Sequence, residues 1–484
     1  MTDKLKIVIA CDTFPPDING AARFAERLAA GLSKHGNEVH VLASATGPIH
    51  GTGVEYFEGF PVTVHRLRSY KVLQHKTLRY VWPIGLRRHI EQILREVNPI
   101  ALHIQSHLVV GRFAVRAARK TGVKLIATNH IMPENLIKYS FVPSWLHKPV
   151  MRLAWKDAGR ILRKMDAVTT PTKRAADLLE RAAGVSGVLA ISCGIDASRF
   201  ANEVPTTNSN PVFLFLGRLD DEKRIHVLLR AVAKLTEFPS VRVELVGDGG
   251  ERENLQRLAF ELGIADRVAF LGHVADKDLP AAYERCTAFV MPSIAELQSI
   301  ATMEAMASGR PVIGADAMAL PHLIHDGDNG YLFPPDDVEA LADRLRRVLN
   351  ADQAELDRMS ENSLHLIQAH DIERTINIFE DLYRGVGESA PTTSDNDPGY
   401  LLPIGSLSEA LREAQVRWRQ ERRTLRLRAE SVRSGIRELF DEAREEAREQ
   451  LEEFKEDVRD LAEEVTERTR RIVRRKNSED EPEG

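Results

Sequence analysis

Two carboxylates stand eight positions apart in the segment SIAELQSIATMEAMASGRPVI, residues 293–313. Glu296 precedes a run with helical character, and Glu304 is the only charged residue between Gln298 and Gly309. At about 100° per residue, apolar side chains fill most of the helical circumference around Glu304, which is typical of a buried helix. A buried carboxylate needs a polar partner or a ligand. Two interpretations of Glu304 stay open: a structural one, with an arginine or a backbone N–H as its partner, and a ligand-binding one.

The loop that carries Glu296 meets the predicted start of this helix. The first N–H groups of a helix lack internal partners and the helix dipole is positive there, so a phosphate group suits this position. Glu296 would then lie near whatever the phosphate carries, and Glu304, over a turn deeper, near a neighbouring part of the same ligand. Carboxylates accept hydrogen bonds from paired hydroxyl groups, as in ribose recognition. The pattern therefore suits a nucleotide that carries a polyhydroxyl group.

A second group of charges follows an apolar run in FLFLGRLDDEKRIHVLLRAV, residues 213–232. The run predicts a strand that ends at Gly217; Arg218 comes next, and Lys223 stands at the entry to a predicted helix. Two cations at the carboxyl end of a strand suit a diphosphate clamp. Taken alone, the segment also fits a solvated loop with ordinary surface charges.

Short apolar runs alternate with helical patterns in the elements that must position these residues. KIVIA is strand-like, AARFAERLAAGLSKHG is an amphipathic helix, and EVHVLA is strand-like again. This βαβ rhythm predicts a parallel sheet covered by helices, and it restarts after the polar break VPTTNSNP at 204–211. We predict an α/β fold with two facing Rossmann-like domains and a ligand at the carboxyl ends of the strands. The predicted parts are a first domain (1–203), a second domain (204–366) and a C-terminal helix of the core (367–388).

A different kind of sequence follows: a predicted linker at 389–404, a long amphipathic helix at 405–476 and a disordered tail at 477–484. Apolar residues recur every three or four positions in one narrow seam, which is typical of a coiled coil. The charges come in blocks, with nine Arg against three Glu in 412–437 and thirteen acidic against four basic residues in 438–464. The blocks favour antiparallel self-association, and a solvated single helix with its seam on the folded core is the alternative.

Together these features resemble the retaining glycosyltransferases of family 4, which have the GT-B fold. The resemblance covers roughly residues 5–385 and rests on three motifs: the E-x7-E glutamate pair, the Gly-Arg-x4-Lys clamp, and DGDNGYLFPPDD at 326–337. It implies an enzyme that moves a hexose from a UDP- or GDP-sugar to a hydroxyl group, with retention of configuration. It also implies that the first domain takes the acceptor, that the second binds the nucleotide sugar, and that no metal or other cofactor is required.

The resemblance assigns a role to each motif residue. Glu304 would bind the ribose and Glu296 would contact the donor sugar. Arg218 and Lys223 would bind the diphosphate and stabilise it as a leaving group. The remaining donor-site residues offer backbone N–H groups or a close approach of the backbone: Gly20, Gly217, Leu297, Gln298, Ser299 and Ile300.

Four features depart from the family pattern. The family often has Phe-Gly or Gln-Gly where this chain has Gln298-Ser299, and it has glycine in place of Arg224. A glycine pair in the first domain is represented only by its second member, Gly20, because Asn19 replaces the first. A Pro-Glu pair that is common in the family is Pro321-His322 here. The departures at Arg224 and at Pro321-His322 leave the donor identity open.

His130 follows the strand-like part of LIATNHIMPEN, residues 125–135. The family carries a histidine there that faces the transferred sugar, so the resemblance implies an active-site role for His130. By its own pattern, a histidine just after a strand is more often structural.

Two basic segments with interleaved aromatic residues bear on the acceptor. Residues 66–88 contain seven Lys or Arg and no acid, and residues 138–164 contain seven Lys or Arg and one acid. Such segments suit an anionic membrane surface, which favours a lipid or lipid-linked acceptor; a solvated basic face with its Trp residues in the core is the alternative. No nucleic-acid-reading motif accompanies the charge, and the net charge is −5, so nucleic acid is not an expected partner.

The cysteine content and the lack of targeting patterns bear on the location of the protein. Three widely spaced cysteines, Cys11, Cys193 and Cys286, lack metal-ligand spacing and predict reduced thiols. No signal peptide and no apolar run of about 20 residues is present. We expect a cytoplasmic protein, peripheral on the inner face of the membrane if its acceptor is a lipid. Two alternatives stay open: a transferase with a soluble acceptor, and a coiled-coil scaffold with an inactive transferase core.

Overall fold

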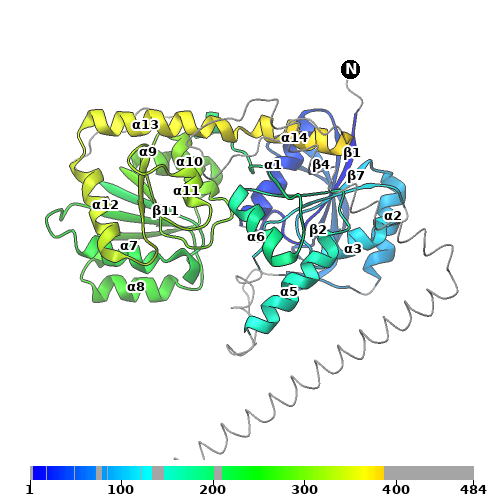
Figure 1. Ribbon diagram of the computed structural model, residues 1–484, viewed down its shortest axis with the longest axis horizontal. Coiled ribbons are helices and arrows are strands. Elements are labelled where there is room, and N and C mark those ends of the chain that lie inside the picture. The colour runs from blue at the N-terminus through cyan, green and yellow to red at the C-terminus, as the bar shows by residue number, and fades with distance from the viewer. Residues whose placement is uncertain are drawn as a thin grey trace, which may run out of the picture. The chain divides into compact units, whose positions relative to one another are not determined.

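The structure is a computed structural model that describes residues 4–17, 19–47, 50–71, 79–83, 85–119, 121–132, 147–200 and 210–385. Within them, two sheets are each covered by helices on both faces (Figure 1). The predicted linker, long helix and tail beyond residue 388 lie outside the described residues. No helix in the described part combines the length and apolar character that a bilayer crossing requires.

The first sheet has eight strands in the order β10-β9-β8-β7-β1-β2-β4-β3. All neighbours run parallel except the edge strand β3, which is antiparallel to β4. The strands are β1 Lys6–Ala10, β2 Glu38–Ser44, β3 Gly51–Phe57, β4 Phe60–Leu67, β7 Ala101–Ile104, β8 Lys124–Thr128, β9 Ala167–Thr170 and β10 Leu189–Ala190, with a separate hairpin of β5 Ser69–Lys71 and β6 Arg79–Val81.

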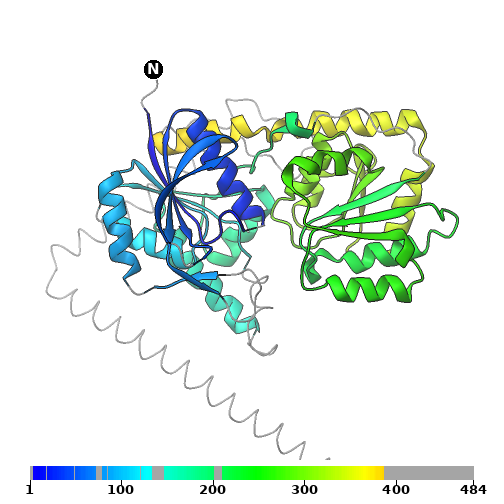
Figure 2. The ribbon, with the colours of Figure 1, turned by 180° about the vertical axis from the view of Figure 1, so that it is seen from behind.

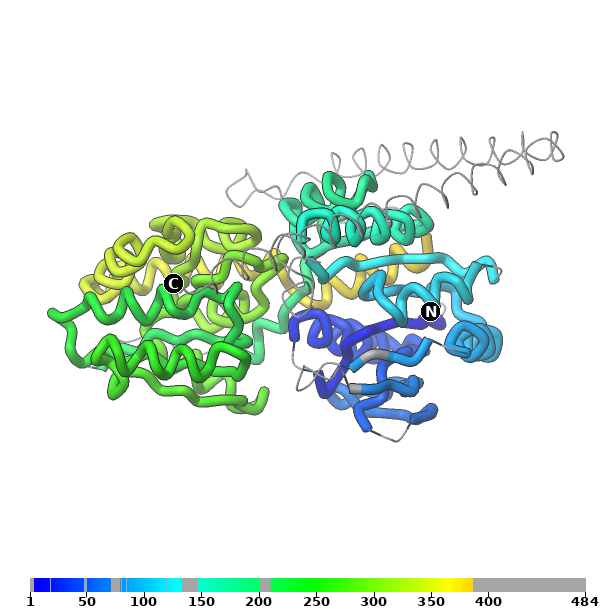
Figure 3. The backbone as a smooth tube through the Cα atoms, turned by 90° about the horizontal axis from the view of Figure 1, so that it is seen from below, coloured from blue at the N-terminus to red at the C-terminus, as the bar shows by residue number. Residues whose placement is uncertain are grey.

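Two hydrophobic cores lie on opposite faces of this sheet, because its central strands are apolar on both sides. One core joins the sheet to α1, and the other joins it to α2, α3, α5 and α6. Helices α5 and α6 pack side by side (Figure 3). The helices are α1 Gly20–Lys34, α2 Leu86–Val97, α3 Val109–Ala118, α5 His147–Leu162 and α6 Lys173–Ala183, followed by the 3₁₀ helix η2 Ala197–Phe200.

The second sheet has six parallel strands in the order β13-β12-β11-β14-β15-β16. From β11 the chain adds strands outward to β13, and it then returns to the other side of β11 to add β14, β15 and β16. Because the direction reverses, the connecting helices change face. Helices α7 and α8 lie on one side of the sheet, and α10 and α11 lie on the other (Figure 1). The strands are β11 Val212–Leu216, β12 Arg242–Val246, β13 Val268–Gly272, β14 Ala288–Met291, β15 Val312–Ala315 and β16 Gly330–Phe333.

The helical segments of this second half are mostly short. They are η3 Asp221–Lys223, α7 Ile225–Ala233, α8 Arg252–Glu261, η4 Ala265–Arg267, η5 Asp276–Asp278, α9 Leu279–Arg285, α10 Ile300–Ala307, α11 Leu320–Leu323, α12 Val338–Asn350, α13 Gln353–Ile367 and η6 Gln368–His370.

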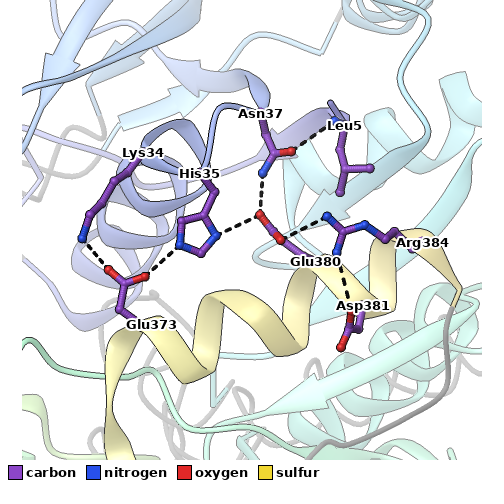
Figure 4. A network of polar contacts seen from close by, with 8 residues as sticks. All are labelled: Leu5, Lys34, His35, Asn37, Glu373, Glu380, Asp381 and Arg384. Carbon is purple, nitrogen blue, oxygen red and sulfur yellow. Dashed lines mark hydrogen bonds and ion pairs between the residues drawn. The ribbon is translucent and has the colours of Figure 1, made fainter. Parts of the chain in front are cut away.

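The last described helix, α14 (Ile372–Arg384), returns to the first sheet and packs on α1 (Figure 2). Its apolar side chains join the core beneath α1, and a polar network ties the two elements at the surface (Figure 4). In that network His35 contacts both Glu373 (2.8 Å) and Glu380 (3.1 Å), and Asn37 donates to Glu380 at 2.6 Å. Helix α14, which follows the second sheet in the sequence, thus completes the hydrophobic core on one face of the first sheet.

These observations confirm the predicted fold class of two Rossmann-like domains. The helix predicted to begin after Lys223 is α7, which starts at Ile225. All three cysteines are free and buried, in line with the predicted reduced thiols.

Candidate active site

The candidate site lies where the strand order of the second sheet reverses. Strand β11 pairs in parallel with β12 on one side and with β14 on the other. Loops that follow two such strands diverge and leave room for a ligand at their carboxyl ends. Gly217 and Arg218 follow β11, and the loop after β14 leads through Glu296 to α10. The fold therefore brings together the two motifs that the sequence separates by over seventy residues.

Lys223 and Glu296 join these two loops. Lys223 is the last residue of η3, and its Nζ donates a hydrogen bond to Oε1 of Glu296. The Lys223 side chain is 15% exposed and that of Glu296 11%, so the ion pair is mostly removed from water. The two charges are close enough to act on one ligand.

Arg218 carries the most accessible charge of the predicted clamp, with 40% of its side chain exposed. Its guanidinium donates to Asp220, and also to Glu222 Oε1 at 3.0 Å. The Glu222 carbonyl in turn accepts the N–H of Ile294 at 3.1 Å, which ties the β11 loop to the β14 loop. Arg218 thus lies on a loop whose backbone is hydrogen-bonded to the loop after β14.

Arg224 stands where the resemblance led us to expect glycine, and it adopts a backbone conformation that favours glycine. Its φ is 49°, in the left-handed region that a side chain disfavours and glycine adopts freely. The Arg224 side chain contacts Asp221 at 2.7 Å and Asp336 at 3.2 Å. The departure therefore keeps the backbone turn after Lys223 and secures it with ion pairs.

The N-terminus of α10 is capped by Ser299. Its Oγ accepts hydrogen bonds from the N–H of Thr302 at 3.4 Å and from the Thr302 hydroxyl at 2.8 Å. The Gly20 backbone at the start of α1 approaches here, because a Cβ built on Gly20 would lie 3.9 Å from Cδ1 of Ile300. The structure thus places Gly20 beside Ile300, the first residue of α10.

The side chains around this helix start reach the first domain. Gln298 Oε1 accepts the N–H of Cys193 at 2.7 Å, and its Nε2 donates to Oγ of Ser192 at 2.9 Å. The carbonyl of Leu297 accepts the hydroxyl of Thr172 at 3.1 Å. The Gln298 side chain and the Leu297 carbonyl therefore join the two domains, which leaves backbone N–H groups as their contribution to a phosphate site.

Glu304 is 4% exposed and has protein partners on both oxygens. Arg27 of α1 donates from Nη2 to Oε1 at 2.9 Å, and the Tyr283 hydroxyl donates to Oε2 at 2.9 Å. Burial disfavours the charge of Arg27, but Glu304 outweighs it and raises the pKa of Arg27. Burial, and then Glu304, raise the pKa of Tyr283 well above its usual range. An arginine partner, one of the two interpretations of Glu304, is thus present.

His130 follows β8 at the carboxyl edge of the first sheet. Its Nε2 lies 3.0 Å from Oε1 of Gln105, and its ring packs at 4.9 Å on that of Phe24 in α1. Burial lowers the pKa of His130 to about 3, so the ring is neutral near pH 7. Since the Gln105 oxygen only accepts, Nε2 carries the proton, and Nδ1 is the ring atom with a lone pair.

Three residues of this site were not predicted from the sequence: Arg27, Tyr283 and Gln105. Arg27 had a recognisable signal, because it is a cation within the apolar pattern of an amphipathic helix. Tyr283 and Gln105 had none, because their roles depend on which strands are neighbours. Within the part of the chain that the structure describes, no cluster of three His, Cys, Asp or Glu is arranged to hold a metal ion.

Two family profiles match successive parts of the chain, and known glycosyltransferases are similar to it in sequence. The profile of Glycosyltransferase Family 4 matches residues 18–199, and that of Glycosyl transferases group 1 matches residues 196–365. The GDP-mannose-dependent alpha-mannosyltransferase of Mycobacterium tuberculosis is 29% identical over 69% of this chain and 85% of its own length. The alpha-monoglucosyldiacylglycerol synthase of Streptococcus pneumoniae is 26% identical over 68% of this chain and 75% of its own.

A third relative is aligned over a shorter region. The sulfoquinovosyl transferase SQD2 of Arabidopsis thaliana is 30% identical over 54% of this chain, and the chain spans about half of that relative, 52%.

Solved structures show the same fold. Sucrose-phosphate synthase from Thermosynechococcus elongatus superposes with a TM-score of 0.65 at 22% identity, over 78% of this chain and 98% of that one. Anabaena HepE in complex with UDP superposes with a TM-score of 0.62 at 20% identity, over 79% and 100%. The two family profiles lie end to end across residues 18–365, and the chain therefore belongs to the family 4 glycosyltransferases of GT-B fold.

Proposed function

We propose that the protein transfers a hexose from a UDP- or GDP-sugar to a hydroxyl group of a lipid or lipid-linked acceptor, with retention of configuration. The observation that carries the proposal is the meeting of Lys223 and Glu296 at the strand-order reversal, beside Arg218 and the start of α10. Cations and free N–H groups suit a diphosphate there, and a carboxylate suits sugar hydroxyls.

In this proposal the second domain holds the donor. Arg218, Lys223 and the N–H groups at the start of α10 stabilise the charge that develops on the departing diphosphate. Because Lys223 donates to Glu296, a diphosphate that binds Lys223 also changes the surroundings of Glu296, which contacts the sugar. Glu304 takes the ribose. With three positive centres from protein groups, the leaving group needs no metal ion.

The first domain supplies the acceptor side. His130 is neutral, so it serves as a hydrogen-bond partner of the transferred sugar and not as a cationic acid. The proton of the attacking hydroxyl passes to an oxygen of the departing diphosphate on the same face of the sugar. Bond formation and cleavage on one face give retention.

The lipid acceptor is supported by an exposed basic stripe on α5. Lys148, Arg152, Lys156 and Arg160 follow one another at intervals of four residues and are all exposed, which places them along one side of the helix. Leu153 on the same side is 51% exposed. Trp155 is buried, as the alternative interpretation of the basic segments expected of its Trp residues, whereas Trp82 is 43% exposed.

Basic side chains with exposed apolar neighbours suit an anionic bilayer surface. The names of two relatives, a glucosyldiacylglycerol synthase and a sulfoquinovosyl transferase, support the same direction. A UDP complex of HepE and a GDP-mannose-dependent relative support a nucleoside-diphosphate donor.

A donor panel tests the proposal. The full chain is incubated with UDP- and GDP-hexoses and a membrane lipid extract, and products are separated and identified by mass spectrometry and by the configuration of the anomeric carbon. We expect one donor to yield a glycolipid with the donor's configuration. Transfer only to water-soluble acceptors, or an inverted product, would contradict the proposal.

A further inference from the structure

Arg27 holds the oxygen of Glu304 that a ribose hydroxyl would need. The two side chains come from different domains, Arg27 from α1 and Glu304 from α10, and their ion pair measures 2.9 Å. The Arg27 side chain is 8% exposed and that of Glu304 6%. A ribose hydroxyl that donates to Oε1 of Glu304 therefore competes with Arg27 for that oxygen.

The pair is also incompletely satisfied. Among the described residues, Nη1 of Arg27 is buried and has no hydrogen-bond partner. A buried charged donor without a partner is unfavourable. The unpartnered Nη1 therefore offsets part of the stabilisation that Nη2 gains from Glu304. Arg27 would gain by leaving Glu304 for a position where both nitrogens find acceptors.

The other oxygen of Glu304 is held from within the second domain. Tyr283 of α9 donates to Oε2 at 2.9 Å and also to the carbonyl of Ala301 at 3.2 Å. Tyr283 therefore fixes the carboxylate to its own domain, whatever Arg27 does. Within the described part of the chain, the contact with Arg27 is what ties the carboxylate to the first domain.

We propose that Arg27 is a further residue of the donor site, which competes with the donor's ribose for Glu304 and so sets nucleotide affinity. When ribose hydroxyls donate to Glu304, Arg27 loses its contact with the carboxylate, so part of the binding energy of the nucleotide is spent on displacing Arg27. Nucleotide binding is thereby coupled to a contact between the domains. The inference rests on the proposed ribose role of Glu304.

Arg23 supplies a matched control. It lies one turn before Arg27 on α1 and also makes an ion pair to the second domain, with Asp276 of η5. Its hydrogen-bonding partner is outside the donor site, so replacing it removes a contact between the domains without freeing Glu304.

The test measures the Kd of UDP and of GDP by calorimetry on the full chain. Couplings between sites are typically about 5- to 150-fold, so we expect Arg27→Met to lower the Kd at least about fivefold. Arg27→Gln keeps an N–H for Glu304 and guards against misfolding of the first variant; we expect a smaller decrease. Arg23→Met should stay within about twofold of the wild type.

A second pair of variants ties the effect to Glu304. In a Glu304→Ala background, Arg27→Met should leave the Kd unchanged, because no side-chain acceptor remains for Arg27 and the ribose to compete for. A higher or unchanged Kd in both Arg27 variants, or an equal decrease in Arg23→Met, would overturn the inference while the proposed function stands. A wild type that binds neither UDP nor GDP would instead contradict the proposed function, and the inference would fall with it.

Discussion

Lys223 donates a hydrogen bond to Glu296 across 73 positions of sequence, and this contact joins the two loops of the candidate active site. One residue of the pair is the proposed ligand of the diphosphate and the other that of the sugar. The two recognition events are therefore coupled: a donor that binds one residue alters the charge environment of the other. Nothing in either motif alone specifies this pairing, which arises because β11 and β14 are neighbours.

Replacing Lys223 should show the coupling in kinetics. We expect Lys223→Ala to lower kcat by about 10²- to 10³-fold, as for other positioned electrostatic groups. Glu296→Ala should cost a similar factor, and the double variant should lose much less than the product of both, because each single change already disrupts the pair. Lys234, an exposed lysine paired with Glu339, is the control. Steady-state rates that multiply in the double variant would show that the two residues act independently.

Acid should destabilise the fold through its buried histidines. Burial lowers the pKa of His103, and likewise of His370, to about 3, below the unfolded value of about 6.5. Between these values the unfolded chain binds more protons than the folded one, so stability present above about pH 6.5 is lost as the pH falls toward 3. Urea midpoints measured from pH 7 to pH 4 should decrease.

A variant isolates one contribution to this slope. His103 contacts Tyr383 and Thr128, both at 2.7 Å, and His103→Gln removes its titration. We expect the decrease between pH 7 and pH 4 to become shallower in this variant and to stay unchanged in the exposed control His89→Gln. Parallel slopes in wild type and His103→Gln would contradict this reasoning.

Gln298 should matter for stability as well as for the donor. Its side chain accepts the buried N–H of Cys193, and Gln298→Ala would leave that N–H without a partner. Such a loss costs about 1–3 kcal/mol, which should appear as a lower urea midpoint at constant m-value. Gln256→Ala on the exposed face of α8 should change the midpoint little. If both variants unfold alike, the side chain of Gln298 has no structural role between the domains.

The fold class and the main candidate site residues could be predicted from the sequence. Periodicity located α1, and motif spacing singled out Arg218, Lys223 and Glu296. What it could not give were contacts that depend on strand order, such as Tyr283 with Glu304 and Gln105 with His130. Periodicity describes which face of an element is buried, but not which element covers it.

The predicted membrane contact can be examined with vesicles. Trp82 and Leu153 are 43% and 51% exposed in the two basic segments of the first domain. We expect Trp82→Ala and Leu153→Asp to reduce cosedimentation with anionic vesicles, by roughly tenfold in partition coefficient when combined, because each loses about 1 kcal/mol or less of apolar contact. Phe260, 78% exposed on the second domain, provides the control variant Phe260→Ala. If the wild-type protein does not cosediment with anionic vesicles, that result would count against a lipid acceptor.

The most direct test of the account is the rate of hexose transfer in Arg218→Ala and Glu296→Ala, measured with the donor that the wild type uses. Arg218 is the exposed cation of the clamp and Glu296 the carboxylate beside it, so the account predicts a loss of about 10²-fold or more in each, with folding unchanged by circular dichroism. Transfer at the wild-type rate in both variants would contradict the assignment of the active site to the carboxyl ends of β11 and β14.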